Sequence, residues 1–222
     1  MLKKGDFIEL KFVGRIAESG EVFDTNIEEE AEKAGLQKPS QPSRICIGEG
    51  MIIKGLDEAL EGIEEEQEHE ILLRPRDAFG ERNSSLVKTI SLSAFVKKGM
   101  TPVRGELVSF DGIVARIAAI SGARVIVDFN HPLAGKVIIY RIRAKKIEDV
   151  KEKLAALASF YLATQIKTEN IKIEGKKAIL EVEKLPAPQV ISTLKQKTTQ
   201  LLDVELELQV KEEEKAINKQ EK

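Results

Sequence analysis

Histidine, cysteine and serine most often carry metal or covalent chemistry, and this chain places them in no catalytic pattern. The two histidines, His69 and His131, are isolated from each other, and Cys46 is the only cysteine. No G-x-S-x-G motif offers a serine nucleophile. Residues 50–55 lack the lysine and hydroxyl residue that must follow the second glycine of a phosphate-binding loop. The sequence therefore predicts no metal, no cofactor and no covalent intermediate.

The residues that remain as candidates for a site are apolar, with one carboxylate among them. Ile8, Leu10 and Phe12 alternate with charged residues, which places their side chains on one face of a strand. A second short strand pattern ends at Asp24. Taken alone, these residues are typical of an ordinary core, and Asp24 is most simply a turn residue.

The composition is that of a folded protein with balanced charge. The chain has 222 residues, of which 42% are hydrophobic, and its 35 basic and 37 acidic residues leave a net charge of −2. Nucleic-acid binding usually needs a concentrated basic surface, which this balance argues against. A lone cysteine suits a reducing compartment, and no apolar stretch approaches the roughly 20 residues of a membrane-spanning helix. We expect a cytoplasmic protein without nucleic-acid or membrane partners.

Hydrophobic periodicity outlines the elements that must position these candidates. Strand patterns at residues 8–12, 22–24, 45–47 and 71–73 accompany a helix barely two turns long at 55–62, and residues 27–43 are predicted to be a connection outside the core. Residues 82–128 predict a small β-rich module, after which a strand resumes at 137–142. The module is therefore predicted to be an insertion within the first domain.

The pattern changes again in the last third of the chain. Apolar residues recur at helical spacing between Ile147 and Tyr161. Strands are predicted at 171–173 and 180–182, a helix at 190–201 after Pro188, and a last strand at 204–210. We therefore expect a separate α/β domain with the order αββαβ, followed by a charged tail at 211–222.

Four motifs follow one another in register along the first part of the chain. They are Lys11-Phe12-Val13-Gly14, Val22-Phe23-Asp24-Thr25, residues 45–56 and Arg74-Pro75-Arg76-Asp77-Ala78-Phe79-Gly80, and residues 130–135 with the strand to 142 follow them. Each motif is weak alone, but together, over roughly two thirds of the chain, they resemble the FKBP-type peptidyl-prolyl cis/trans isomerases. The insertion and residues 130–135 resemble the SlyD branch, which carries an insert-in-flap domain, and the C-terminal extension resembles long archaeal members.

The resemblance implies an α+β fold with three parts and a tail. Residues 1–82 and 129–146 would form an FKBP-type antiparallel half-barrel around a short helix. Residues 83–128 would form the insert-in-flap domain, 147–210 the C-terminal α/β domain and 211–222 the charged tail. It also implies catalytic residues Phe12, Asp24, Phe79 and Tyr140, and substrate-binding residues Phe23, Ile47, Ile52, Ile53, Leu56, Ala78 and Leu133.

The chain departs from the family pattern at three of these positions. Phe12 and Phe79 stand where tyrosine is usual, and Leu56 stands where tryptophan usually forms the pocket floor. The missing hydroxyls could weaken activity or macrolide binding. Leu56 occurs in SlyD-like relatives and bears on drug affinity more than on catalysis.

The resemblance also implies partners for the added domains. SlyD-like inserts bind unfolded chains, so Phe95, Met100, Val103 and Phe110 are predicted to contact unfolded or partly folded proteins with X-Pro bonds. Packing into the small core of the insert is the competing role for these side chains. The C-terminal domain could form a homodimer through its alternating last strand, or bind clients or another folding factor.

Two functions compete for the whole chain. The first is a peptidyl-prolyl cis/trans isomerase that assists folding, which Asp24 and the row Ile52, Ile53 and Leu56 favour. The second is a non-catalytic holdase or assembly module on an FKBP fold, which the missing hydroxyls of Phe12 and Phe79 favour. Of the two, we expect the isomerase.

Overall fold

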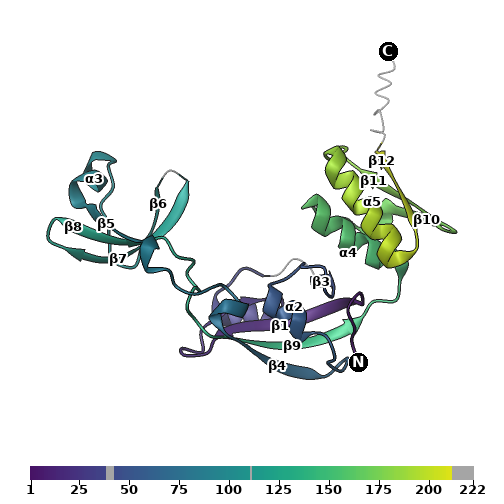
Figure 1. The fold of residues 1–222 in the computed structure, drawn as a ribbon, viewed down its shortest axis with the longest axis horizontal. Coiled ribbons are helices and arrows are strands. Elements are labelled where there is room, and N and C mark those ends of the chain that lie inside the picture. Colours follow the sequence, from purple (N-terminus) through teal and green to yellow (C-terminus); the bar gives the residue numbers. More distant parts are fainter. Residues whose placement is uncertain (39–42, 111, 212–222) are drawn as a thin grey trace, which may run out of the picture. The chain divides into compact units, whose positions relative to one another are not determined.

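The computed structural model describes residues 1–38, 43–110 and 112–211 (Figure 1). The chain divides into two compact units, one made of residues 1–14, 22–71 and the chain from 140 onwards, the other of residues 15–21 and 72–139. The α+β class predicted from the sequence is confirmed, with three separate sheets. No helix in these described ranges is long and apolar enough to cross a membrane.

The first sheet is built from five strands. Its order is β2-β1-β9-β4, and β3 pairs with β1 in antiparallel register from Phe7 opposite Cys46 to Leu10 opposite Ser43. Ile8 and Leu10 are fully buried, as their alternation predicted. The strands are β1 (Phe7–Ile16), β2 (Val22–Thr25), β3 (Ser43–Cys46), β4 (Glu68–Leu73) and β9 (Ile138–Lys146).

Two helices accompany this sheet, and the sequence predicted only one of them. The expected short helix is α2 (Lys54–Ala59), which buries Leu56. The second helix, α1 (Glu28–Ala34), lies in the segment that was predicted to be a connection outside the core, and it buries Ala31 completely. That expectation was wrong because the acidic residues form the first turn of a helix. Negative charge there stabilises the helix by interacting with the positive end of its dipole.

The inserted segment forms its own four-stranded antiparallel sheet with the order β5-β8-β7-β6. A helix that the sequence did not predict, α3 (Leu92–Lys97), closes the core of this sheet with Phe95. Ile117, Val125 and Val127 are fully buried beside it. The strands are β5 (Val87–Ser91), β6 (Leu107–Phe110), β7 (Ile113–Ser121) and β8 (Arg124–Asp128).

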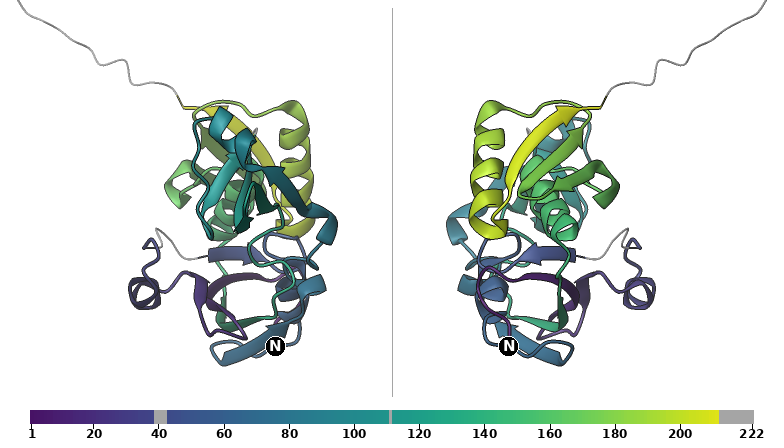
Figure 2. Two further views of the ribbon diagram at one scale, coloured as in Figure 1. Left: turned by 90° about the vertical axis from the view of Figure 1, so that its left-hand side faces the viewer. Right: turned by 90° about the vertical axis from the view of Figure 1, so that its right-hand side faces the viewer.

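The segment 147–210, here the C-terminal module, has the predicted αββαβ order. β10 and β11 are antiparallel, whereas β11 and β12 are parallel, so the chain needs α5 as a crossover between them. α4 and α5 contact each other and pack against this sheet (Figure 2). The elements are α4 (Val150–Leu162), β10 (Ile171–Glu174), β11 (Lys177–Val182), α5 (Pro188–Leu202) and β12 (Glu205–Val210).

The C-terminal module shares one hydrophobic core with the first sheet. Phe7 of β1 and Cys46 of β3 belong to the same buried cluster as Leu154 of α4 and Leu194 of α5. α4 contacts β3 directly. Burial of the Cys46 thiol is the main cause that raises its pKa to about 12, so it stays a neutral core residue.

Candidate functional site

Three aromatic rings from adjacent strands form a cluster on the first sheet. The ring of Tyr140 lies 5.9 Å from that of Phe12 and 5.9 Å from that of Phe23, with interplanar angles of 65° and 82°. These edge-to-face contacts are favourable because the positive ring edge meets the negative face. Tyr140 is only 4% exposed, so the cluster is rigidly packed at its centre.

Gly14 of β1 leaves the space in which this cluster packs. A Cβ atom at position 14 would lie 2.8 Å from Cε1 of Tyr140 and 2.9 Å from Cζ of Phe23. Both distances are shorter than real side chains show, so any larger residue must displace a ring. The motif Lys11-Phe12-Val13-Gly14 includes this glycine, but its packing role was not predicted, because a glycine near a strand end is usually a turn signal.

Asp24 precedes two residues whose side chains fasten β2 to β1. The Thr25 hydroxyl donates to the Phe12 carbonyl at 2.7 Å. The Asn26 carboxamide accepts from the Phe12 amide at 2.8 Å and donates to the Leu10 carbonyl at 2.6 Å. These bonds fix the chain at Asp24 beside Phe12. Sequence reasoning missed Asn26, whose one signal was its position directly after a short strand.

Burial shifts the pKa values of the two polar groups at the cluster, the Asp24 carboxyl and the Tyr140 phenol. Partial burial raises the pKa of the Asp24 carboxyl above its usual range, although a hydrogen bond from the Thr25 amide opposes this shift. Burial also raises the pKa of the Tyr140 phenol, and the negative charge of Asp24 adds to the effect. Tyr140 is therefore a neutral hydrogen-bond donor at physiological pH, close to the Asp24 carboxyl group.

The remaining predicted pocket residues of the first unit surround the start of α2. Ile47 and Leu56 are almost fully buried, whereas Ile52 and Ile53 are half-buried. Ile47 and Ile52 also line a cavity of about 460 Å³ that includes Asp57 and other charged residues in its walls. Ile47 and Ile52 form the apolar part of these walls, whereas the charged part would not contact a proline ring favourably.

Ala78, Phe79 and Leu133 belong to the second unit. All three are half-buried, and Phe79 stacks on His131 with ring centroids 4.8 Å apart and an interplanar angle of 1°. The Gly135 amide donates to the Gly80 carbonyl at 2.8 Å, which brings the outgoing and returning segments together. His131 is thus a stacking residue. Among the described residues, no group of three or more histidine, cysteine or carboxylate side chains could hold a metal ion.

Polar side chains tie together the two chain segments that enter and leave the insert. Arg82 donates to the Asp128 carboxylate at 2.6 Å, and the Asn83 amide donates to the Asn130 side chain at 2.8 Å. The Asn130 side chain donates in turn to the Asn83 carbonyl at 3.0 Å. Burial raises the pKa of Asp128, but bonds from Arg82 and Asn130 outweigh it and the net shift is downward. The junction is therefore held by ionic and amide contacts.

The four predicted client-binding residues of the insert fall in different environments. Phe95 is fully buried, and Met100 packs against the same core. Val103 is 48% exposed. Phe110 lies on β6, and its side chain is outside the described residues. Other apolar side chains are more exposed than these, namely Val96, Leu107, Ile113 and Val114, at 65%, 57%, 59% and 60%.

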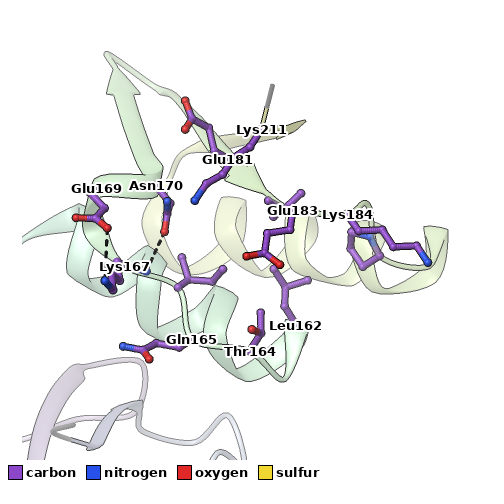
Figure 3. A pocket seen from close by; sticks show the side chains of 13 residues that line it. Leu162, Thr164, Gln165, Lys167, Glu169, Asn170, Glu181, Glu183, Lys184 and Lys211 are labelled. Atoms are coloured by element: carbon purple, nitrogen blue, oxygen red, sulfur yellow. Dashed lines mark hydrogen bonds and ion pairs between the residues drawn. The ribbon is translucent and has the colours of Figure 1, made fainter. Parts of the chain in front are cut away.

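The C-terminal module contains a second cavity, of about 440 Å³, that the sequence did not predict (Figure 3). Its walls combine Leu162, Ile166 and Val182 with three lysines and three glutamates. Lys167 and Glu169 pair with each other at 3.6 Å across its edge. These balanced charges select neither an anion nor a cation.

Comparison with known protein families gives the class of protein to which this fold belongs. One family model, described as FKBP-type peptidyl-prolyl cis-trans isomerase, matches residues 1–94, and another, described as FKBP26, IF domain, matches residues 88–133. A short-type peptidyl-prolyl cis-trans isomerase of Methanocaldococcus jannaschii is 30% identical over 156 residues, which cover 69% of this chain and 98% of the relative. The chain therefore belongs to the FKBP-type peptidyl-prolyl cis-trans isomerases.

Bacterial relatives agree with this membership. The SlyD isomerase of Helicobacter pylori is 31% identical over 139 residues, which cover 61% of this chain and 69% of the relative. That of Treponema pallidum is 34% identical over 116 residues, which cover 50% and 65%. The resemblance seen in the sequence, including the insert-in-flap segment, is confirmed. The protein is an enzyme whose substrates are proteins with prolyl bonds.

Proposed function

We propose that the protein isomerises X-Pro bonds in a non-covalent pocket built around Phe12, Phe23, Asp24 and Tyr140. The barrier to rotation is amide resonance, about 18–20 kcal/mol, so no bond needs to be broken. A planar amide separates charge more than a twisted one, and an apolar site therefore disfavours the planar ground state. The observation that carries this proposal is the packed aromatic cluster beside a single carboxylate.

The proposed pocket also includes side chains that would grip the proline ring. Ile52 and Ile53 are half-buried and retain surface for a ligand, while Ile47 and Leu56 would support the floor from below. The resemblance also assigns site roles to Ala78, Phe79 and Leu133 of the second unit, in which the stacking on His131 orients the ring of Phe79. In this arrangement Tyr140 supplies a phenol close to Asp24, so the site keeps a hydroxyl although Phe12 lacks one.

Asp24→Ala is expected to lower kcat/KM for an X-Pro tetrapeptide about tenfold or more, because hydrogen bonds to a charged group contribute roughly 1.5–3 kcal/mol. Since the ionised carboxylate is the active form and its pKa is raised, wild-type activity should start to fall at a higher pH than an ordinary aspartate would give. Asp24→Asn should show no such fall. Protease-free kinetics from about pH 4, near the ordinary aspartate pKa of about 3.9, up to about pH 8 measure both effects. An unchanged kcat/KM in folded Asp24→Ala would rule out this role.

The insert is proposed to bind unfolded or partly folded proteins. Val96, Val103, Leu107, Ile113 and Val114 support this because each is at least 48% exposed in an insert that already has its own core. Where such side chains lie together, as Ile113 and Val114 do on β7, they would offer an apolar surface to a client. Phe95 and Met100 would act indirectly, by holding this surface in shape.

The proposed domain limits are residues 1–82 with 129–146 for the isomerase domain, 83–128 for the insert, 147–210 for the C-terminal module and 211–222 for the tail.

A homodimer through the C-terminal module is proposed on the position of β12. This strand is at an edge of its sheet, and Val210 is 49% exposed there. An unpaired edge can add a strand from a second copy. Sedimentation should give twice the chain mass of 24.7 kDa, and Val210→Lys, at an exposed position of this strand, should give the single mass. A wild-type protein of single mass at micromolar concentration would contradict the dimer.

The single, buried cysteine supports a cytoplasmic location.

A further inference from the structure

The loop Gly48-Glu49-Gly50-Met51 is held in shape from the side of α2. The buried Asp57 carboxylate accepts the Gly48 amide at 2.8 Å and the Gly50 amide at 3.1 Å. Both glycines have positive φ, 83° and 66°, which lets the two amides turn toward one carboxylate. One aspartate therefore fixes the conformation of the loop.

The C-terminal module holds the same loop from its other side. The Lys197 ammonium of α5 pairs with the Glu49 carboxylate at 2.7 Å, and the Glu49 side chain is only 10% exposed. Met51 packs against the core shared by β1, β3, α4 and α5, and its Sδ accepts the Cys46 amide at 3.2 Å. The loop is thus clamped between Asp57 and the C-terminal module.

The clamped loop continues directly into Ile52 and Ile53. The Ile53 carbonyl accepts the amides of Leu56 and Asp57, both at 3.0 Å, and so begins α2. No flexible residue separates the clamp from these side chains. A shift of the loop must therefore move the isoleucines that are proposed to grip proline.

We propose that the C-terminal module is a positioning element for the prolyl pocket, acting through the Lys197–Glu49 ion pair and Met51. Glu49 and Lys197 are positioning residues: Glu49 belongs to the loop, Lys197 holds it there, and neither is proposed to contact the substrate. This inference rests on the proposed assignment of Ile52 and Ile53 to the pocket. It gives the module a role in catalysis within one chain, whether or not the chain forms a dimer.

The Lys197–Glu49 pair differs from other ion pairs of the same module. Lys176 and Asp203 also approach closely, at 2.5 Å, but their side chains are 77% and 80% exposed. Exposed ion pairs contribute little to the stability of the fold, because water and salt screen their charges and the long side chains lose conformational entropy. The shielded Glu49 carboxylate, in contrast, is left without compensation when Lys197 is removed. The exposed pair therefore offers a matched control.

The test compares Glu49→Gln, Lys197→Gln and the double variant in the full chain, with Lys176→Gln as control. On an X-Pro tetrapeptide, each single variant should raise KM about threefold to tenfold and leave kcat within about twofold. The double variant should be no worse than the worse single variant, because both remove one interaction. The control should match wild type. Single variants with the KM of the control would overturn the inference.

Amide hydrogen exchange of residues 48–51 separates this inference from the proposed pocket. Exchange should be about tenfold faster in both single variants and unchanged in the control, because the clamp keeps the loop closed. Unchanged exchange would overturn the inference even if the pocket assignment holds. Ile53→Ala tests the pocket assignment separately. If this variant kept wild-type kinetics while exchange in the loop variants became faster, the pocket assignment would fail. The ion pair would then be a structural contact without a catalytic role, which also refutes this inference.

Discussion

Gly14→Val is expected to lower kcat/KM for prolyl isomerisation on the order of 100-fold, because displacement of about 1 Å at a catalytic group has that effect. A Cβ at this position would already lie 2.8 Å from Tyr140 and 2.9 Å from Phe23. Either ring must then move, and with it the surface beside Asp24. Coupled isomerisation assays on a tetrapeptide, together with thermal unfolding of the same samples, measure the effect.

The control for this substitution is Gly20→Ala. Gly20 has a φ of 71°, so alanine strains the backbone there, but no atom lies within 4 Å of the added Cβ. This variant carries a cost in stability of about 1–2 kcal/mol without touching the cluster, and its kcat/KM should equal that of wild type. If folded Gly14→Val isomerised the peptide as fast as Gly20→Ala does, the cluster would not be the catalytic centre.

Replacement of residues 83–128 by a short glycine-serine link is expected to slow the proline-limited refolding of a protein substrate on the order of 100-fold. A tethered client-binding surface raises the effective concentration of prolines at the pocket, and such linkage typically contributes a factor of about 10²–10⁴. A tetrapeptide does not need this surface, so its kcat/KM should stay within about threefold. Refolding followed by fluorescence, in parallel with the peptide assay, measures the difference.

A milder variant keeps this prediction testable if the deletion perturbs the rest of the fold. Ile113→Ser with Val114→Ser changes two side chains that are 59% and 60% exposed, so the core around Phe95 remains intact. Refolding activity should fall about tenfold while peptide activity is retained. Ser93→Ala, a small polar change in the same insert, is the control. Full refolding activity in both the deletion and the double serine variant would exclude a client-binding role.

The strands were predictable from sequence because their side chains alternate or recur at simple spacing. Ile8 and Leu10 on β1 and the αββαβ order of the C-terminal module follow from such patterns. α1 was missed because its three glutamates resemble a solvated run, although Ala31 and the left-handed Gly35 mark a capped helix. α3 was missed because six residues are too few to establish a helical period.

The site was predictable only in part, and for a physical reason. The family resemblance implied Phe12, Asp24 and Tyr140, but the contacts that shape the candidate site come from residues far apart in the chain. The Asn26 side chain accepts a hydrogen bond from the backbone amide of Phe12, fourteen positions earlier. The Asp57 carboxylate accepts hydrogen bonds from two loop amides, seven and nine positions earlier. No local pattern encodes such contacts. The burial of Phe95 likewise depends on α3 folding back over its sheet.

Isomerase activity is tested most directly by the rate of cis/trans exchange of an X-Pro peptide with and without the protein. Uncatalysed exchange takes tens to hundreds of seconds at 25 °C, so catalysis is readily resolved by a protease-free assay. We predict an acceleration that is proportional to protein concentration and is lost in folded Gly14→Val. Exchange as slow as in buffer, with protein shown to be folded, would contradict the assignment of this aromatic cluster as an isomerase site.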